Sequence, residues 1–121
     1  MPMPGNDTIE SSQVLTVAAN RGVDLTNAPA VRLQTLDVAR HVAIDPNGKR
    51  YVVATFDDRH IDRGYVTAVY PQQNGYLTLV RLMVCELKSE TRDGALLNHV
   101  QLINTIQQGK LTEFVLSLQK A

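Results

Sequence analysis

The central part of the chain, residues 50–87, alternates runs of apolar and β-branched residues with two polar segments, residues 57–64 and 71–75. Both polar segments contain glycine, and the second begins with proline. Runs of this kind, separated by turn-forming residues, are typical of strands that follow one another in an antiparallel meander. We therefore expect residues 50–87 to form most of a sheet on which the rest of the chain packs.

A hairpin is predicted at the start of this sheet. The sequence DPNG at residues 45–48 is a strong turn signal, because proline presets the backbone and Asn-Gly tolerates positive φ. It lies between two apolar runs, which predicts antiparallel strands over residues 38–44 and 51–56. Further strands are predicted over residues 65–70 and 76–87.

The N-terminal third of the chain has a less distinct pattern. Residues 1–12 begin with MPMPGND, and we expect a flexible lead-in because proline and glycine at this density join neither a ladder nor a helix. Residues 13–19, QVLTVAA, are rich in β-branched residues, which favours a strand over the first turns of a helix. Residues 31–45 alternate like a strand at first and then fit a helix face, so residues 13–45 are either strand throughout or partly helix.

After Lys88 the apolar positions recur at helical spacing. Ser89 or Thr91 is expected to cap a helix that ends at Gly109. The positions that predict a second helix, at i, i+3, i+4 and i+7, are Leu111, Phe114, Val115 and Leu118. The predicted fold class is α+β: an N-terminal antiparallel β-meander of about four to six strands, followed by two C-terminal helices packed on the sheet. Residues 13–121 would form one domain.

Composition limits the partners of this chain. Twelve basic residues balance twelve acidic residues, so we expect no partner that depends on a strong net charge, neither duplex nucleic acid nor an anionic membrane. No apolar stretch approaches the roughly 18 residues of a membrane helix, and the N-terminus does not resemble a signal peptide. The single cysteine, Cys85, fits a buried thiol in a reducing compartment. We expect a cytoplasmic protein.

Six of the seven residues in segment 57–63, DDRHIDR, are charged or titratable. The residues with metal-ligating atoms are Asp57, Asp58, His60 and Asp62. A small metal-dependent phosphodiesterase or nuclease would use His60 as general base, Asp62 to orient it and Arg59 to stabilise charge. The segment lacks the glycine of a calcium loop, a second histidine and a cysteine, so a solvated loop with local ion pairs explains the same residues.

Enzymatic chemistry has little support elsewhere in the sequence. The chain contains no nucleophile elbow, phosphate-binding glycine loop, dinucleotide fingerprint or zinc pair. We therefore expect neither a metal nor a cofactor, and no catalytic residues.

The arginines form the pattern that is most informative about binding. Arg59 and Arg63 flank the charged loop, whereas Arg81 lies within an apolar strand. A half-buried guanidinium needs an anionic partner, and its planar fork suits carboxylate or phosphate. If loop, strand and helix start converge, they frame a recess for a small phosphorylated molecule. The candidate ligand-binding residues are Arg59, Arg63, Tyr65, Arg81, Arg92, Asn98 and His99. Alternatively, Arg81 snorkels or pairs with a glutamate, and the histidines are structural.

The layout of the chain resembles that of a known family. A meander followed by two short helices, with no catalytic constellation and with arginines at polar positions, looks like the small phage proteins of the Thoeris anti-defence type. The segments that carry the resemblance are HVAIDPNGKRYVVATFDDRHIDRGYVTAVYP and DGALLNHVQLINTIQQGKLTEFVLSL. Proteins of this family sequester the cyclic ADP-ribose signal made by bacterial TIR-domain proteins.

The resemblance implies a non-catalytic sponge for a small phosphorylated, nucleotide-derived signal, a cyclic ADP-ribose isomer or a cyclic oligonucleotide. It also implies a homodimer or larger homo-oligomer with pockets near subunit interfaces, in the host cytoplasm if the gene is phage-encoded. Two alternatives stay open. One is the phosphodiesterase that uses loop 57–62, and the other is an oligomeric protein-interaction domain that docks through the apolar helix 111–118.

Overall fold

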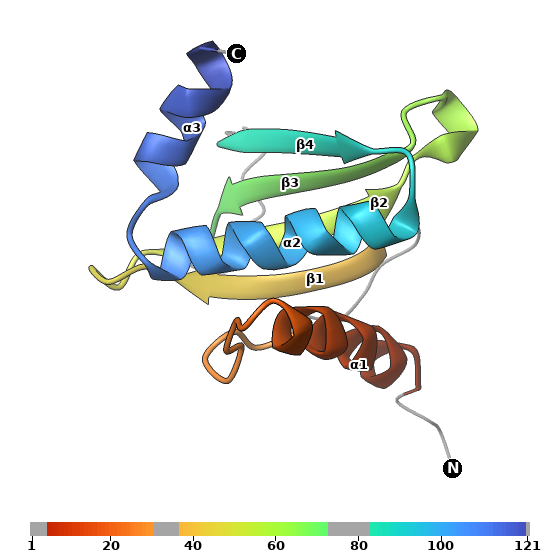
Figure 1. Cartoon of the computed structure of the whole chain (residues 1–121), viewed down its shortest axis with the longest axis horizontal. Helices are drawn as coiled ribbons and strands as arrows, with labels where there is room; N and C mark the ends of the chain where they lie inside the picture. Colours follow the sequence, from red (N-terminus) through yellow and green to blue (C-terminus); the bar gives the residue numbers. More distant parts are fainter. Residues whose placement is uncertain (1–4, 31–36, 73–82, 121) are drawn as a thin grey trace.

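Four antiparallel strands form the sheet in the part of the chain that the computed structural model describes, residues 5–30, 37–72 and 83–120. The strands are β1 (Asp37–Ile44), β2 (Arg50–Asp57), β3 (Tyr65–Pro71) and β4 (Cys85–Ser89). They lie side by side in sequence order, and each neighbouring pair is antiparallel (Figure 1). The predicted meander and the α+β fold class are therefore confirmed.

The β1–β2 hairpin turns at the predicted DPNG sequence. The carboxylate of Asp45 accepts hydrogen bonds from the backbone N–H groups of Asn47 and Lys49, both at 2.9 Å. The backbone N–H of Gly48 donates to the carbonyl oxygen of Asp45 at 2.9 Å. An Asp side chain that holds its own turn in this way fixes the register of the two strands.

The β2–β3 connection contains a short 3₁₀ helix, η1 (Arg59–Ile61), and lies against the end of β4. Gly64 has a φ of 69°, and a Cβ atom at this position would lie 2.7 Å from the carbonyl oxygen of Ser89. Only glycine combines this backbone conformation with such a close approach. The charged loop is therefore fixed against β4.

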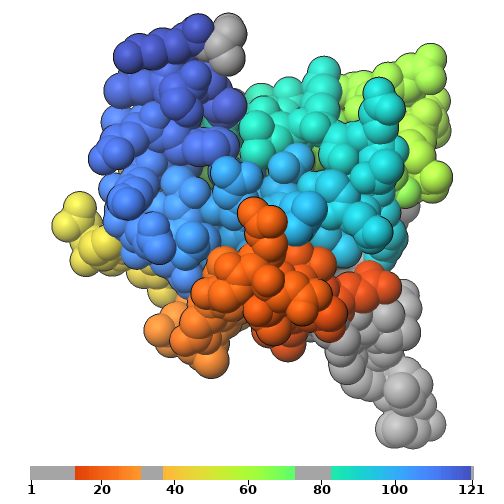
Figure 2. Space-filling model, in the orientation of Figure 1, coloured from red at the N-terminus to blue at the C-terminus, as the bar shows by residue number. Residues whose placement is uncertain are grey.

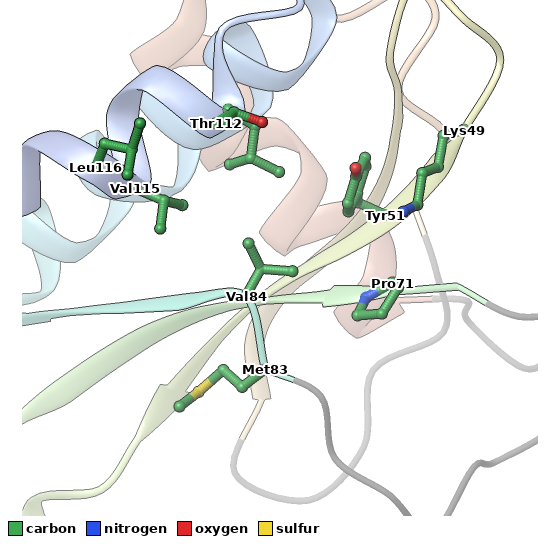
Figure 3. Close-up of a pocket in the computed structure, with 9 residues that line it drawn as sticks. Lys49, Tyr51, Pro71, Met83, Val84, Thr112, Val115 and Leu116 are labelled. Carbon is green, nitrogen blue, oxygen red and sulfur yellow. The ribbon is translucent and has the colours of Figure 1, made fainter. Parts of the chain in front are cut away.

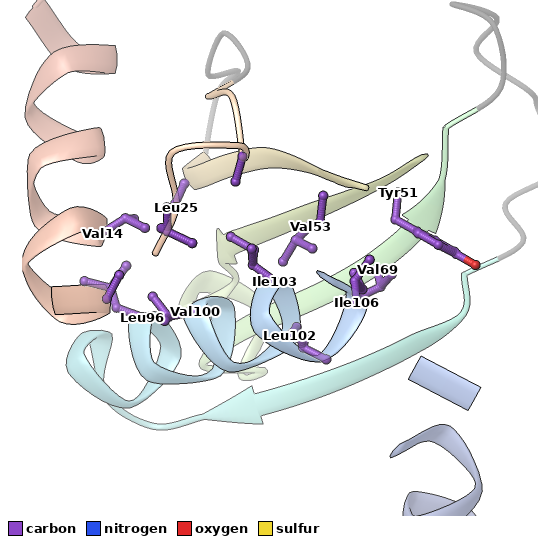
Figure 4. Packing of buried hydrophobic residues seen from close by; sticks show 14 of the residues in the cluster. Val14, Leu25, Tyr51, Val53, Val69, Leu96, Val100, Leu102, Ile103 and Ile106 are labelled. Atoms are coloured by element: carbon purple, nitrogen blue, oxygen red, sulfur yellow. The ribbon is translucent and has the colours of Figure 1, made fainter. Parts of the chain in front are cut away.

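Helix α2 (Arg92–Gln107) lies across one face of the sheet and contacts all four strands (Figures 1 and 4). The hydroxyl of Thr91 accepts a hydrogen bond from the backbone N–H of Gly94 at 3.0 Å, so Thr91 is the N-cap. The largest apolar side chains that α2 buries completely are Leu102, Ile103 and Ile106. The predicted helical stripe is the centre of the core.

Helix α3 (Leu111–Lys120) follows a turn at Gly109, where a Cβ atom would lie 3.2 Å from Cγ of Pro46. This close contact places the α2–α3 turn against the β1–β2 turn. Leu111 is buried, whereas Leu116 is 52% exposed. The half-buried residues of α3 that pack against the core are Phe114, Val115 and Leu118. The second predicted helix is present, and it stands beside the start of β4 (Figures 1 and 2).

The strand expected over residues 13–19 is wrong, because these residues belong to helix α1 (Gly5–Asn20). Val14 and Ala18 are four positions apart and buried, and α1 contacts α2 and β1. Burial of one helical face against two elements outweighs the modest strand preference of β-branched residues. The helix begins inside the segment expected to be a lead-in.

Two sequence expectations lie partly outside the described residues. Of the strand predicted over residues 76–87, residues 76–82 are not described, and β4 continues to Ser89. Residues 31–36 are likewise not described, and β1 begins at Asp37.

Candidate functional site

Arg59 lies at the surface of the β2–β3 loop, where a carboxylate already contacts its guanidinium. Its Nε and Nη2 donate to the two carboxylate oxygens of Asp57 at 2.9 and 2.8 Å. The guanidinium carbon lies 5.1 Å from the centre of the Tyr65 ring. The side-chain hydrogen bond from Arg59 is the main cause that lowers the pKa of Asp57 to about 2. Two predicted ligand-binding residues therefore meet here, with an internal carboxylate as the anion.

Arg63 also has carboxylate partners within the fold. Its guanidinium donates to the carboxylate of Glu86 on β4, and Nη1 lies 3.8 Å from Oδ2 of Asp58. These contacts tie the loop to β4. The arginines that flank the charged segment thus form local ion pairs.

Three further polar candidates, Arg92, Asn98 and His99, lie on α2. Arg92 donates from Nη2 to Oε1 of Gln13 on α1 at 2.7 Å, which ties α2 to α1. Asn98 is half-buried on α2. Arg81 lies outside the described residues.

His99 is completely buried beneath α2. Its Nε2 lies 2.9 Å from Nδ1 of His41 on β1, and its Nδ1 lies 2.9 Å from Oγ1 of Thr55 on β2. Oγ1 of Thr55 lies 2.8 Å from Oγ1 of Thr67 on β3, which donates to the carbonyl oxygen of Ala95 at 3.4 Å. We refer to these four side chains and this carbonyl as the His–Thr chain. Both imidazole nitrogens of His99 have partners inside the protein.

Burial determines the protonation of both histidines in the His–Thr chain. Desolvation lowers the pKa of His41 to about 4. Desolvation, and to a lesser extent the neighbouring His41, holds the pKa of His99 well below its ordinary value. Both rings are therefore neutral at pH 7.

The charged loop does not gather its acidic residues and His60 around one point. Asp57 and Asp58 face arginines, and His60 and Asp62 are exposed. Within residues 5–30, 37–72 and 83–120, no group of three or more His, Cys, Asp or Glu side chains is arranged to hold a metal ion.

A pocket of about 380 Å³ lies at the other end of the strands, between α3 and the sheet (Figure 3). Residues that line it are Lys49, Tyr51, Pro71, Met83, Val84, Leu111, Thr112, Val115 and Leu116. Thr112, Val115 and Leu116 of α3 lie on one side of the pocket, and Lys49 and Tyr51 lie on the other (Figure 3). The size is within the range of small-molecule sites, which are mostly apolar with a few polar groups.

Lys49 is the cation of this pocket. Its Nζ lies 5.4 Å from the centre of the Tyr51 ring, a cation–π distance. Among the described residues, no carboxylate lies within ion-pair distance of its ammonium group. The pocket therefore combines an apolar floor, the hydroxyl of Thr112 and an ammonium group that faces an aromatic ring.

Lys49 and Tyr51 are not among the ligand-binding residues predicted from the sequence. The available signal was their spacing at i and i+2 around the start of β2, which places two side chains on one face of a strand. The opposite wall comes from α3, far away in the sequence, and only the fold brings the two together.

Comparisons of the sequence with family models, with curated proteins and with solved structures give no match. Within the described part of the chain, no helix is both long and apolar enough to cross a membrane.

Proposed function

We propose that this protein is a non-catalytic binding protein for a small organic anion, which lies in the pocket between α3 and the sheet. The observation that carries the proposal is Lys49, an ammonium group beside an apolar cavity without a carboxylate partner among the described residues. An anion at this position would gain a charge-assisted contact without first displacing an internal ion pair.

The apolar lining of the pocket favours a ligand with a flat or aliphatic body. Leu116 is 52% exposed, so a ligand body that lies against it would cover apolar surface that now contacts water. Thr112 adds a hydroxyl that can donate to the ligand or accept from it.

Nucleotide-derived signals contain both parts, a planar base and phosphate groups. The resemblance described above suggests the same class of ligand, and sequestration needs tight binding without turnover. We therefore propose cyclic ADP-ribose isomers and cyclic oligonucleotides as the first ligands to test, with the protein acting as a sponge.

The test is ligand retention. Purified protein is incubated with a panel of cyclic oligonucleotides, cyclic ADP-ribose isomers and simple aryl and alkyl carboxylates, and unbound material is removed. The protein is then denatured by heat, and mass spectrometry identifies the released molecules. We expect one member to be released unchanged, and Lys49→Gln to weaken its binding about tenfold or more because a charge-assisted contact is lost.

Arg63→Gln is the matched control, since it removes one cation at the opposite end of the strands. We expect this variant to retain the ligand at wild-type affinity. Release of a hydrolysed product would instead support the phosphodiesterase that uses loop 57–62. Retention of no panel member, or loss of retention in Arg63→Gln alone, contradicts the proposed site.

A further inference from the structure

The most unusual polar feature of the interior is the His–Thr chain, because it joins α2 to three strands through side chains that are almost completely enclosed. His99, Thr55 and Thr67 are 0% exposed, and His41 is 4% exposed. Helix α2 contributes His99 and the carbonyl of Ala95, and the sheet contributes the other three members.

The Ala95 end of the His–Thr chain determines the direction of each hydrogen bond within it. The carbonyl oxygen of Ala95 can only accept, so Thr67 donates to it. Thr67 then accepts from the hydroxyl of Thr55, and Thr55 accepts from Nδ1–H of His99. Nε2 of His99 is left as an acceptor for Nδ1–H of His41.

This order assigns the same tautomer to both histidines, with the proton on Nδ1. Nε2 of His99 is enclosed and already accepts a hydrogen bond, so an added proton there would face the N–H of His41. Nε2 of His41 has no hydrogen-bond partner among the described residues, and no described side-chain N or O atom is both buried and unpartnered. Within the His–Thr chain, Nε2 of His41 is therefore the nitrogen that the order of donors leaves for an added proton.

The carboxylates on the strands next to the pair, Asp37 on β1 and Asp57 on β2, are already held by arginines. The other titratable groups on the α2 side of the sheet are Tyr51 and Asp57 on β2, Tyr65 on β3 and Cys85 on β4. The carboxylate of Asp57, which is charged at pH 7, is paired with Arg59. On β1, Arg40 pairs with Asp37 and lies over the ring of Phe56.

The described side chains of the two helices packed around the pair, α1 and α2, include one anion, Asp93. Residues 13–20 of α1 carry no charged side chain. The charged residues of α2, Arg92 and Asp93, lie in its first turn, where the positive end of the helix dipole disfavours a cation.

We propose that the His41–His99 pair is an acid-operated latch, which in the neutral form holds α2 on β1, β2 and β3 and on protonation releases α2 from the sheet. A cation inside the His–Thr chain breaks the one-way order of donors, and the carboxylates of β1 and β2 already have arginine partners. The apolar core residues of α2 pack on the same face of the sheet as His99. Release of α2 from the sheet therefore exposes the core and unfolds the domain. In the folded state both histidines therefore stay neutral, and each binds a proton once unfolding exposes it to water.

The test is the number of protons taken up on unfolding. Urea unfolding is followed between pH 6 and pH 5, where exposed histidines are largely protonated but carboxylates remain charged. A histidine with a pKa near 6.5 in the unfolded chain takes up about 0.9 proton on average in this range, so two histidines lower the folding equilibrium constant by about 60-fold per pH unit and one lowers it by about eightfold. We expect about 60-fold for the wild-type protein and about eightfold for His41→Asn, whose amide keeps a donor near the position of Nδ1 without titrating.

His60→Asn is the matched control, because His60 is the exposed third histidine of the chain. It should leave the wild-type dependence on pH unchanged. A wild-type change of tenfold or less per pH unit, or an unchanged slope in His41→Asn, overturns the proposal.

Nitrogen NMR of the wild-type protein supplies a second readout if His41→Asn does not fold. At pH 7, both His41 and His99 should carry their proton on Nδ1, and at pH 5.5 both rings should still be neutral in the folded state. A proton on Nε2 of His99 at pH 7, or a charged ring at either position in folded protein at pH 5.5, contradicts the latch.

Discussion

At the β2–β3 end of the sheet, Arg59 and Arg63 contact carboxylates of the same loop and of β4, whereas at the opposite end Lys49 contacts the ring of Tyr51. The first end has the denser charge. The second end has the cavity and the cation without a carboxylate partner among the described residues. A guanidinium held by an internal carboxylate has to exchange that partner before it binds a ligand, and an ammonium over an aromatic ring does not.

Charge density in a sequence is therefore a poor guide to a binding site unless the pairing of the charges is known. The loop contains both signs of charge at short spacing, so its groups neutralise one another locally. The lining of the pocket contains one lysine, and most of its other residues are apolar. This difference can be tested by perturbing the two ends and the interior that joins them.

The largest effect of a single substitution is expected from Leu111→Ala at the pocket end. Leu111 is buried where α3 begins and lines the pocket, so its truncation leaves a cavity and detaches α3. We expect a loss of about 2–3 kcal/mol in the free energy of unfolding, together with loss of ligand binding. Leu116→Ala is the control, since Leu116 is 52% exposed, and it should change stability by about 0.5 kcal/mol or less. Similar values for the two variants in urea unfolding at pH 7 would contradict this account of α3.

Lowering the pH is expected to affect the buried histidines of the interior but not the ion pairs of the charged loop. His41 has its pKa lowered from 6.5 to about 4 in the folded state, so the folded protein binds fewer protons than the unfolded chain between these values. Stability is complete above pH 6.5, falls as the pH drops below that value, and has lost about 3 kcal/mol through His41 alone near pH 4. Asp57 keeps its charge down to about pH 2, so its pair with Arg59 persists in this window.

Urea unfolding at a series of pH values measures this loss, with Arg59→Gln as the control. The variant should show the same decline as the wild-type protein. A decline that begins only below pH 4, or that disappears in Arg59→Gln, would place the acid-sensitive group in the loop.

A smaller effect is expected when one member of the His–Thr chain loses its hydroxyl. Thr55→Val keeps the shape of the side chain but leaves Nδ1–H of His99 without an acceptor, which costs about 1–2 kcal/mol. Thr112→Val makes the same change at an exposed position and should be close to neutral. Thermal or urea unfolding compares them directly, and equal stability of the two variants would show that the hydrogen bond contributes nothing.

The smallest effect is expected from Arg63→Gln at the charged end. The Arg63 side chain is 37% exposed and that of Glu86 is 26% exposed, so solvent screens their attraction. We expect the free energy of unfolding to fall by about 0.5 kcal/mol, and by no more than about 1 kcal/mol. A loss above 2 kcal/mol in urea unfolding would mean that the loop is a principal stabilising element.

The sequence was sufficient for features that depend on local signals. The DPNG turn predicted the β1–β2 hairpin, Thr91 was one of two proposed caps for α2, and the spacing from Leu111 to Leu118 predicted α3. Each of these signals lies within a few residues of the element it specifies. For α1, local propensity and tertiary burial favour different structures, and burial determines the outcome.

The candidate sites depend on contacts between residues that are distant in the chain. His41 and His99 are 58 positions apart, and no local pattern indicates that their rings meet. Lys49 faces α3 only because Gly109 places the α2–α3 turn against Pro46. The pairing of Arg63 with Glu86 depends in the same way on the alignment of β3 with β4.

The most direct measurement is a backbone amide NMR titration of the wild-type protein with adenosine monophosphate, a probe that has one planar base and one phosphate. Our account predicts concentration-dependent shifts at Lys49, Tyr51, Thr112 and Leu116, and unchanged positions for the amides of Arg59 and Arg63. Shifts confined to the β2–β3 loop, or no shift at the pocket at millimolar probe, would contradict the assignment of the binding site to the end beneath α3.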